Sequence, residues 1–371
     1  MRASCVRFHE AKPTQSKAVL LQSLRVHNNP LALAMDLLLF HRDQYEKLYN
    51  CSYKTEAEWA KEGSPNVPLG ILYIVIGTSF ISLYMLCLRV MFTKQLRQSS
   101  CLKIMIQIGV MDMANLVANC VYTGYLTMIG AVFCTAPLQQ YIAGSYIMFA
   151  WTICSLTSVL LCLNRALELM FPRRMDVLFG GYRIFFWLAL PWLYGIYFGG
   201  YTPSPSFSTK VYAWFFDPYL GMDDLKVDRS YYNSPPHTYH NIGTSIIFTI
   251  LYAVHFATLW WKTRFSTSEA MGKTKRKLFI QAFLISTINF SACVCYVIIE
   301  HIMPPTFVIL TAHFLWICCN CGPVVIYLTV NKTIQAEFIR TFMPRNMHSR
   351  MIAPTSVTTP AGKSTSRASV A

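Results

Sequence analysis

Seven long apolar stretches follow one another between Leu69 and Val330, separated by shorter polar segments. A helix of about 20 apolar residues crosses the hydrocarbon core of a bilayer, so each stretch is long enough to span a membrane. None of them alternates apolar and polar residues with the period of two that is typical of a transmembrane barrel. In lipid, helices satisfy their own backbone polar groups. The pattern therefore predicts an all-α membrane protein, a seven-transmembrane helix bundle.

The predicted spans begin and end where each apolar stretch does. They lie at Leu69–Phe92, Leu102–Ile129, Gln139–Leu163, Ile184–Tyr201, Asn241–Trp261, Leu278–Ile302 and Thr306–Val330.

The segments outside residues 69–330 are polar. Residues 1–68 form an N-terminal segment, in which Met35 opens a more compact start, so residues 1–34 are interpreted as an alternative-start extension. Residues 331–343 place Ile334, Phe338 and Phe342 at helical spacing, which predicts a short amphipathic helix on the membrane surface. Residues 344–371 are rich in Ser, Thr and Pro and are predicted to be a disordered tail.

The charges in the loops predict the orientation of the bundle. Lys and Arg gather after the first span (Lys94 and Arg97), after the third, and between residues 262 and 277, whereas residues 130–138 and 303–305 contain none. Because short cytoplasmic loops carry the excess of basic residues, the N-terminus is predicted to lie outside and residues 344–371 inside. Asn50 begins an N-x-[ST] sequence in this outer segment and is a candidate glycosylation site.

Composition agrees with a membrane domain. Hydrophobic residues make up 54% of the chain and charged residues 13%, against about 25% charged in a typical soluble domain. The net charge of +15 could indicate nucleic-acid binding, but the basic residues flank the spans and lack interleaved aromatic platforms. We therefore predict no nucleic-acid partner.

Most of the 13 cysteines lie inside the apolar stretches, where they act as small buried hydrophobic residues. Cys318, Cys319 and Cys321 fall within one predicted helix and lack the paired loop spacing of a zinc site. The sequence thus indicates no metal and no cofactor.

Two cysteines stand out on the outer side, Cys51 and Cys134, with Cys5 as the remaining one there. An oxidising exterior favours pairing, and residues 202–240 contain no cysteine. We predict a Cys51–Cys134 disulfide that ties the N-terminal segment to the start of the third span.

Candidate switch residues lie within or at the inner ends of the spans. Asp112 lies in the middle of the second span with Asn115 on the same helical face, which indicates either a functional polar network or a hydrogen-bonded structural acid. Arg165 follows Asn164 at the inner end of the third span and has Glu168 as an i,i+3 partner. Either Arg165 is an ordinary basic residue of a cytoplasmic loop that pairs with Glu168, or its contacts hold it in one state and release it in another to bind a partner protein. In the seventh span, Pro323 predicts a kink, either mobile or static, between Asn320 and Tyr327.

A ligand pocket between helices is expected in the outer halves of spans three, five, six and seven. The candidates are mostly aromatic and carry little charge, which suits a small apolar or weakly polar ligand, and no enzyme constellation stands out. They are Tyr141, Tyr146, Met148, Trp151, Asn241, Thr244, Phe248, Tyr296, Glu300, Phe307, Thr311 and Phe314.

Several short motifs resemble, in their order and spacing, the nematode serpentine chemoreceptor family called Srt, a group of rhodopsin-like G-protein-coupled receptors. They are YNCS, KIMIQIGVMDMANL, FCTAPLQQYIAG, LLCLNRALEL, WFFDP and CGPVVIYLTVNKTI, between about Tyr49 and Phe342. The resemblance implies a chemosensory receptor with odorant-like or pheromone-like ligands and a heterotrimeric G protein as partner.

By this resemblance Arg165 takes the place of the Arg in the rhodopsin-like Asp-Arg-Tyr motif, with Asn164 replacing the acid and Ala166 the aromatic residue. Glu168 can then substitute only partly for the missing acid. The sixth span lacks the Trp-x-Pro pattern, and Gly322 shifts the spacing from Pro323 to Tyr327 by one residue. These departures imply a divergent switch.

The leading hypothesis is a ligand-activated receptor in the plasma membrane of sensory cells, in their cilia, surrounded by membrane lipid. The alternative is a seven-helix ligand-gated channel or transporter, although no internal repeat supports transport. A helical scaffold that binds no ligand is the third possibility.

Overall fold

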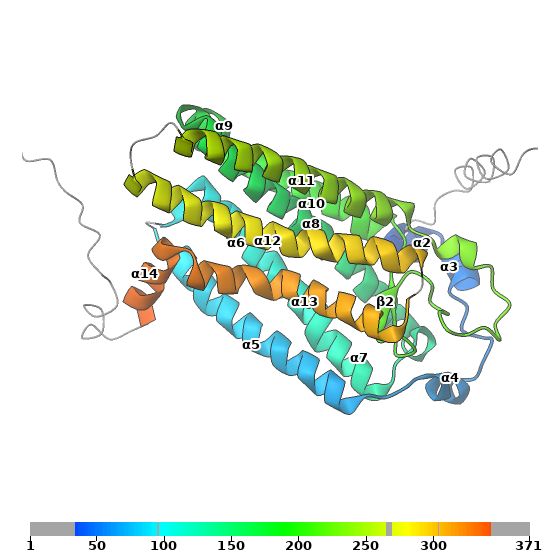
Figure 1. Ribbon diagram of the computed structural model, residues 1–371. Coiled ribbons are helices and arrows are strands. Elements are labelled where there is room, and N and C mark those ends of the chain that lie inside the picture. The colour runs from blue at the N-terminus through cyan, green and yellow to red at the C-terminus, as the bar shows by residue number, and fades with distance from the viewer. Residues whose placement is uncertain (1–33, 95, 265–268, 303, 343–371) are drawn as a thin grey trace, which may run out of the picture.

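The computed structural model describes residues 34–94, 96–264, 269–302 and 304–342. Seven helices in it are long and apolar enough to cross a membrane, which confirms the predicted bundle. They run side by side along one axis (Figure 1). Their bounds are α5 (Val67–Met91), α6 to α7 (Ser100–Ile129), α8 (Pro137–Met170), α10 (Arg183–Tyr201), α11 (Pro235–Arg264), α12 (Glu269–His301) and α13 (Thr306–Thr329).

Shorter elements mark the two ends of the bundle. One end, here called the capped end, carries α2 (Ala34–Phe40), α3 (Arg42–Leu48), α4 (Glu56–Glu62), η3 (Phe133–Thr135), β1 (Ser206–Ser208), β2 (Ala213–Phe215) and η5 (Arg229–Tyr232). The other, the Arg165 end, carries η1 (Leu96–Gln98), η4 (Pro172–Arg174), α9 (Met175–Phe179) and α14 (Lys332–Phe342). A helix thus occupies most of the predicted stretch 331–343, and it packs its buried Ile334 toward α13 and α5. The predicted alternative-start extension, residues 1–34, lies outside the described residues apart from Ala34, as do Cys5 and the tail 344–371.

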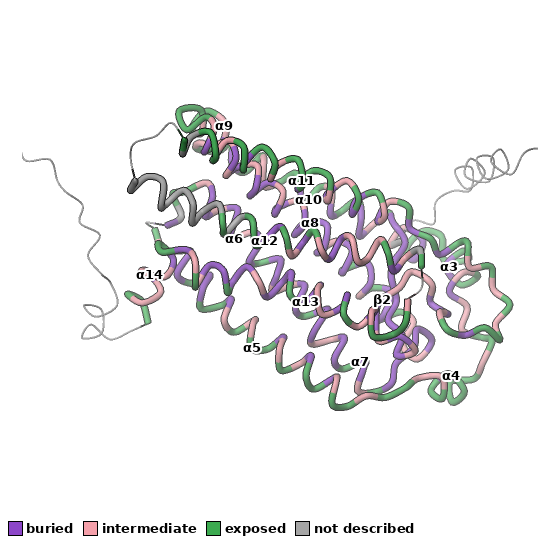
Figure 2. The backbone as a smooth tube through the Cα atoms, viewed as in Figure 1, coloured by how far each residue is buried: buried purple, intermediate pink, exposed green. Residues whose placement is uncertain are grey.

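Helix α8 lies at the centre of the bundle. In its most apolar window 72% of the residues are buried, against 22% in α5, whose outer side is exposed along its length (Figure 2). Helix α8 contacts α6, α10, α11 and α12. It begins at Pro137, a residue suited to a first helical turn, and continues to Met170, two residues before Pro172. The predicted end at Leu163 was therefore too early, and Arg165 lies inside the helix.

The second span is not a uniform α-helix. Its middle, Val117–Tyr122, forms a π-helical turn that the hydrophobic pattern did not indicate. Gly77 of α5 faces this turn, and a Cβ atom on it would lie 2.6 Å from Cys120 Cβ. The span ends at Gly130, whose φ of 70° is the left-handed conformation that glycine adopts without strain.

The capped end folds the N-terminal segment onto the bundle. Cys51 and Cys134, the pair that the sequence singles out, form a disulfide with Cα atoms 5.5 Å apart. Helix α4 begins with a capping box between Thr55 and Glu58. Trp59 of α4 is buried and donates its indole hydrogen to the Cys51 carbonyl oxygen (2.8 Å). The disulfide and α4 therefore form one structural unit.

A short antiparallel hairpin from the segment between α10 and α11 lies under this unit. Phe207 of β1 pairs with Trp214 of β2, and both side chains are buried. The side chain of Gln140 in α8 accepts a hydrogen bond from the Phe207 amide (2.9 Å), and Thr209 donates to the Ala131 carbonyl oxygen (3.0 Å). These contacts hold the hairpin against the beginning of α8.

Candidate functional site

A cavity of about 60 Å³ lies between the hairpin and the helices below it. Its wall combines residues of α8, the hairpin and its flanks, α11, α12 and α13. They are Ile147, Met148, Trp151, Pro205, Trp214, Phe215, Phe216, His237, Tyr296, Ile299, Glu300 and Trp316. An apolar cavity that admits benzene measures about 150 Å³, so this cavity is closed to a ring of that size unless its wall moves.

Two ionisable side chains, from α11 and α12, form one side of the cavity. His237 Nδ1 lies 3.6 Å from Glu300 Oε2, which is beyond hydrogen-bond length. Glu300 Oε2 accepts a hydrogen bond from Thr238 (2.7 Å). The ring of Phe216 packs edge-on against His237 with centroids 5.2 Å apart. The cavity is thus apolar, with one concentrated polar side.

Four of the predicted ligand residues line this cavity: Met148, Trp151, Tyr296 and Glu300. Asn241 lies directly behind the wall, where its side chain contacts both Trp151 (3.4 Å) and His237 (3.1 Å).

Three other candidates lie on exposed faces of their helices, outside the wall of this cavity. Tyr146 is 38% exposed and donates to the Ala114 carbonyl oxygen of the neighbouring span (3.0 Å). Phe307 is 70% exposed, and Thr311, one turn further, is also exposed and donates back to the Phe307 carbonyl oxygen.

The remaining candidates are packing residues outside the cavity wall. Tyr141 belongs to an aromatic cluster at the capped end, with its ring centroid 4.8 Å from that of Tyr49. Phe314 packs against Tyr73 at 5.4 Å. Thr244 and Phe248 are buried in α11 without reaching the cavity.

The sequence reasoning missed the hairpin as part of the cavity wall. Trp214, Phe215 and Phe216 are consecutive aromatic residues in an otherwise polar segment, and this run was the available signal. His237 was missed because α11 begins at Pro235, six residues before the predicted start of the span.

Arg165 lies at the opposite end of α8. It forms an ion pair with Glu168 (2.6 Å) and donates to Asn164 Oδ1 (2.8 Å). Asn164 in turn donates to Ser100 Oγ of α6 (3.4 Å). The Arg165 side chain is only 10% exposed, so Glu168 and Asn164 together hold it against the bundle.

Asp112 is fully buried in the centre of the bundle and joins four helices. Tyr84 of α5 donates to the Asn320 carbonyl oxygen of α13 (2.8 Å) and lies 2.5 Å from Asp112 Oδ2. Cys154 of α8 donates to Asp112 Oδ1 (3.1 Å). Asn115 does not reach Asp112 and bonds back to the Met111 carbonyl oxygen (3.0 Å). The partners of Asp112 are therefore Tyr84 and Cys154, which the sequence did not single out for the predicted polar network.

The predicted kink residue Pro323 lies inside α13, which continues through it to Thr329. The Asn320 side chain donates to the Trp316 carbonyl oxygen, one turn earlier (2.8 Å). Tyr327 is fully buried next to the Asp112 network, with a hydroxyl that has no hydrogen-bond partner among the described residues. These positions join the switch candidates of α13 to the polar centre.

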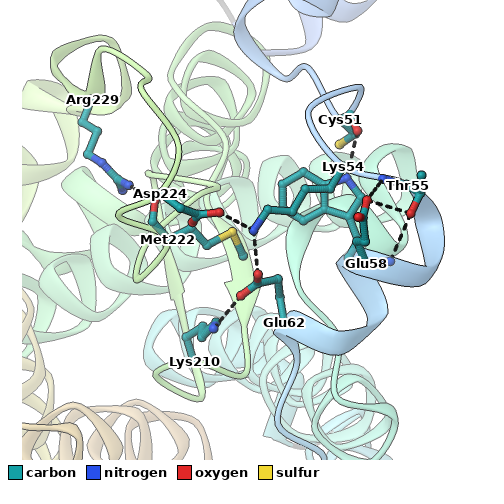
Figure 3. A network of polar contacts seen from close by, with 10 residues as sticks. Cys51, Lys54, Thr55, Glu58, Glu62, Lys210, Met222, Asp224 and Arg229 are labelled. Atoms are coloured by element: carbon teal, nitrogen blue, oxygen red, sulfur yellow. Dashed lines mark hydrogen bonds and ion pairs between the residues drawn. The ribbon is translucent and has the colours of Figure 1, made fainter.

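The capped end carries an ionic network outside the membrane-spanning helices (Figure 3). Glu62 contacts Lys54 (2.6 Å) and Lys210 (2.7 Å), and Lys54 also contacts Asp224 (2.6 Å). Hydrogen bonds from Lys210 and Lys54 lower the pKa of Glu62, and those to Asp224 and Glu62 raise the pKa of Lys54. The network joins α4 to the segment that contains the hairpin.

Within the described residues, no three His, Cys, Asp or Glu side chains are grouped as a metal site.

The chain is similar to known chemoreceptor sequences. Residues 35–351 match the profile of the family described as "Serpentine type 7TM GPCR chemoreceptor Srt". The chain is also 24% identical over 296 residues to Serpentine receptor class T-55 of Caenorhabditis elegans, an alignment that covers 78% of this chain and 79% of that receptor. The family match extends over every spanning helix and both ends of the bundle.

Proposed function

This chain belongs to the Srt family of serpentine seven-transmembrane chemoreceptors, and we propose that it is a chemosensory receptor that binds a small ligand and activates a heterotrimeric G protein. The observation that carries the proposal is the double role of α8. This helix lines the cavity with Ile147, Met148 and Trp151 and holds Arg165 at the other end of the bundle. Trp151 and Arg165 are 14 residues apart, or about 21 Å along the helix axis.

The cavity supports a small ligand with an apolar body. Its wall is mainly aromatic and aliphatic, and its volume of about 60 Å³ leaves little free space. Binding therefore requires the wall to widen, which gives the ligand a different affinity for the closed and open states. The hairpin residues and α8 share this wall, so a ligand that moves the wall also acts on α8.

At the other end, displacement of α8 would carry Arg165, Asn164 and Glu168 with it and strain the hydrogen bond from Asn164 to Ser100 of α6. Separation of α8 from α6 would expose the Arg165 cation and open a cleft for a helix of the G protein. The Asp112 network lies between the two sites and joins α8 to α5, α6 and α13. It is positioned to couple the two ends.

We assign the capped end to the outside and the Arg165 end to the cytoplasm, in the plasma membrane of sensory cilia. The distribution of Lys and Arg supports this orientation, since Arg165, Arg173 and Arg174 lie at one end. The disulfide lies at the opposite end, where an oxidising exterior would form it.

The test of signalling is ligand-dependent nucleotide exchange by a reconstituted G protein, measured for the wild type and for Arg165→Ala. We expect the variant to lose most of the exchange while ligand binding, measured by thermal stabilisation, is retained. Arg173→Ala is the matched control, because Arg173 is an exposed cation of η4 at the same end. Unchanged exchange by Arg165→Ala at equal surface expression contradicts the mechanism.

Orientation has its own test. Asn50 is partly exposed at the capped end, and its sequon predicts a glycan if that end is outside. The wild type should lose apparent mass on treatment with a glycosidase, and Asn50→Gln should not. A wild type without glycan, together with an Asn50 segment protected from external protease, would favour an inverted ligand-gated channel.

A further inference from the structure

Two residues that line the cavity each carry a buried polar atom without a hydrogen bond. Trp316 Nε1 of α13 and His237 Nδ1 of α11 have no hydrogen-bond partner among the described residues, and the two residues are 4% and 8% exposed. Both side chains line the cavity. Since a buried polar group without a partner is costly, a group that fills the cavity and pairs with these atoms would be favoured.

Neighbouring hydrogen bonds determine the chemical character of His237 Nδ1. Trp151 donates its indole hydrogen to Asn241 Oδ1, which turns the amide nitrogen of Asn241 toward His237 Nε2 at 3.1 Å. An amide nitrogen only donates, so His237 Nε2 accepts. A neutral imidazole whose Nε2 accepts carries its hydrogen on Nδ1. The unpaired atom of His237 is therefore a donor.

Trp316 Nε1 is a donor by chemistry, because an indole nitrogen carries a hydrogen and accepts none. Two donors from different helices thus line one small apolar cavity. Trp316 is held by edge-on packing against Tyr296 (6.3 Å) and His313 (5.6 Å), so its ring has little freedom to find another partner.

We propose that this cavity selects uncharged ligands with an apolar body and a hydrogen-bond acceptor of the carbonyl type, such as ketones, aldehydes, esters or lactones. The proposal rests on the proposed function and narrows its ligand class. A carbonyl oxygen has two lone pairs and can accept from both Trp316 and His237. A hydrocarbon would leave both donors unpaired.

A carboxylate is disfavoured, because it would be placed beside Glu300, whose Oε2 lies 3.6 Å from His237 Nδ1, and like charges repel strongly where water is excluded. An ammonium group would pair with Glu300, but it offers only donors and would leave Trp316 and His237 unpaired. The amine is therefore the competitor that the test must separate from the ketone.

The test compares cyclopentanone, cyclopentane, cyclopentylamine and cyclopentanecarboxylic acid, which share one ring. Their binding to the purified full-length receptor is measured as the concentration dependence of the unfolding temperature. We expect cyclopentanone to bind at least about tenfold more tightly than each of the other three, because a site with buried donors rejects analogues that lack the acceptor. Tighter binding of the amine or the acid overturns the proposal, and so does equal binding of the hydrocarbon.

Variants test whether the two donors, and not the rest of the cavity wall, determine the affinity for the ketone. Trp316→Phe keeps an aromatic ring and removes the indole hydrogen. It should weaken the binding of cyclopentanone about tenfold and leave the affinity for cyclopentane unchanged. Trp187→Phe is the control, because Trp187 lies outside the cavity wall and already donates its indole hydrogen to the Leu178 carbonyl oxygen (3.1 Å). His237→Phe provides a second removal of a donor if Trp316→Phe lowers the yield of folded receptor. Equal ketone affinity in the wild type and in both donor variants would show that ordered water accepts the hydrogen bonds of the donors, and would contradict the proposal.

The outcome distinguishes this proposal from the proposed function. Selective ketone binding without nucleotide exchange supports the ligand class and contradicts coupling to the G protein tested. Nucleotide exchange driven by an acid or an amine supports the receptor function and overturns the ligand class. If none of the four compounds changes the unfolding temperature, the ligand class is wrong for this cavity.

Discussion

At the capped end, segments far apart in the sequence are joined by covalent and ionic links, whereas at the Arg165 end the ion pairs between described residues lie within single helices. The disulfide joins Cys51 to Cys134, and Lys54 reaches Asp224 across 170 residues of sequence. At the Arg165 end, among the described residues, Arg165 pairs with Glu168 of its own helix and Arg340 with Glu337 of its own helix.

This difference indicates where the bundle can change shape. Links between segments must break or stretch when those segments move, whereas an ion pair inside one helix moves with it as a unit. Helices at the Arg165 end can therefore shift relative to one another without breaking one of these ion pairs, although contacts such as the Asn164–Ser100 hydrogen bond would have to change, while the capped end keeps the cavity wall together. The predictions that follow remove two links of the capped end and one contact of the buried centre.

Removal of the disulfide should have the largest effect. We expect Cys51→Ser to lower the stability by about 2 to 5 kcal/mol, the usual cost of losing a native disulfide. The measurement is the unfolding temperature in one detergent together with surface expression. Cys134→Ser should lower the stability by a similar amount, and the double variant should be no less stable than either single variant.

Cys318→Ser is the control for this comparison, because Cys318 is an exposed free cysteine of α13. If Cys51→Ser and Cys318→Ser unfold at the same temperature, the capped end does not depend on its covalent link.

Removal of the Tyr84 hydroxyl should have an intermediate effect. Tyr84→Phe leaves the Asn320 carbonyl oxygen and Asp112 Oδ2 without this contact in the buried centre. We expect a loss of about 1 to 3 kcal/mol, measured by thermal unfolding. Tyr125→Phe is the control, since Tyr125 is 52% exposed on the outer face of α7. A smaller loss in Tyr84→Phe than in Tyr125→Phe would show that the polar centre does not hold the helices together.

Removal of the ionic network should have the smallest effect on stability, and this effect should depend on pH. The pKa of Glu62 is lowered from 4.5 in the folded state, so its ion pairs stabilise the fold above that pH. This contribution is lost as the pH falls through the lowered pKa of the folded state. We expect Glu62→Gln to lower the stability by no more than about 1 kcal/mol at neutral pH. The stability of this variant should fall less steeply in acid than that of the wild type.

Unfolding temperatures between neutral pH and pH about 3 test this expectation. Glu46→Gln is the matched control, because the Arg42–Glu46 pair is exposed and lies within α3. High salt should reduce the difference between the Glu62 variant and the wild type, and a difference that grows with salt would exclude an ionic origin.

The spans could be predicted from the sequence because hydrophobicity is a local property. Each of the seven helices lies where an apolar stretch indicated it, and the family resemblance from Tyr49 to Phe342 falls inside the matched range 35–351. Helix ends were less predictable. Helix α8 continues past its apolar stretch to Met170, because helix propensity and not hydrophobicity decides where it stops.

The cavity could be predicted only in part, since it depends on contacts between distant segments. Met148 and Trp151 were predicted from their position in the outer half of a span, but Phe307 was predicted in the same way and faces outward. Trp214 and Phe216 lie in a loop, where no periodicity indicates direction, and the hydrogen bond from Phe207 to Gln140 is what fixes the hairpin. Such tertiary contacts have no local signal in a single sequence.

The π-helical turn at Val117–Tyr122 has a consequence for evolutionary comparison. A turn closed by i→i+5 bonds holds one more residue than an α-helical turn, and one residue corresponds to a rotation of about 100°. A relative that lacks one residue here could keep both halves of the span facing the same neighbours by replacing the π turn with an ordinary one. Alignments of Srt receptors should therefore tolerate a single-residue gap at this place inside a membrane span, where gaps are otherwise penalised.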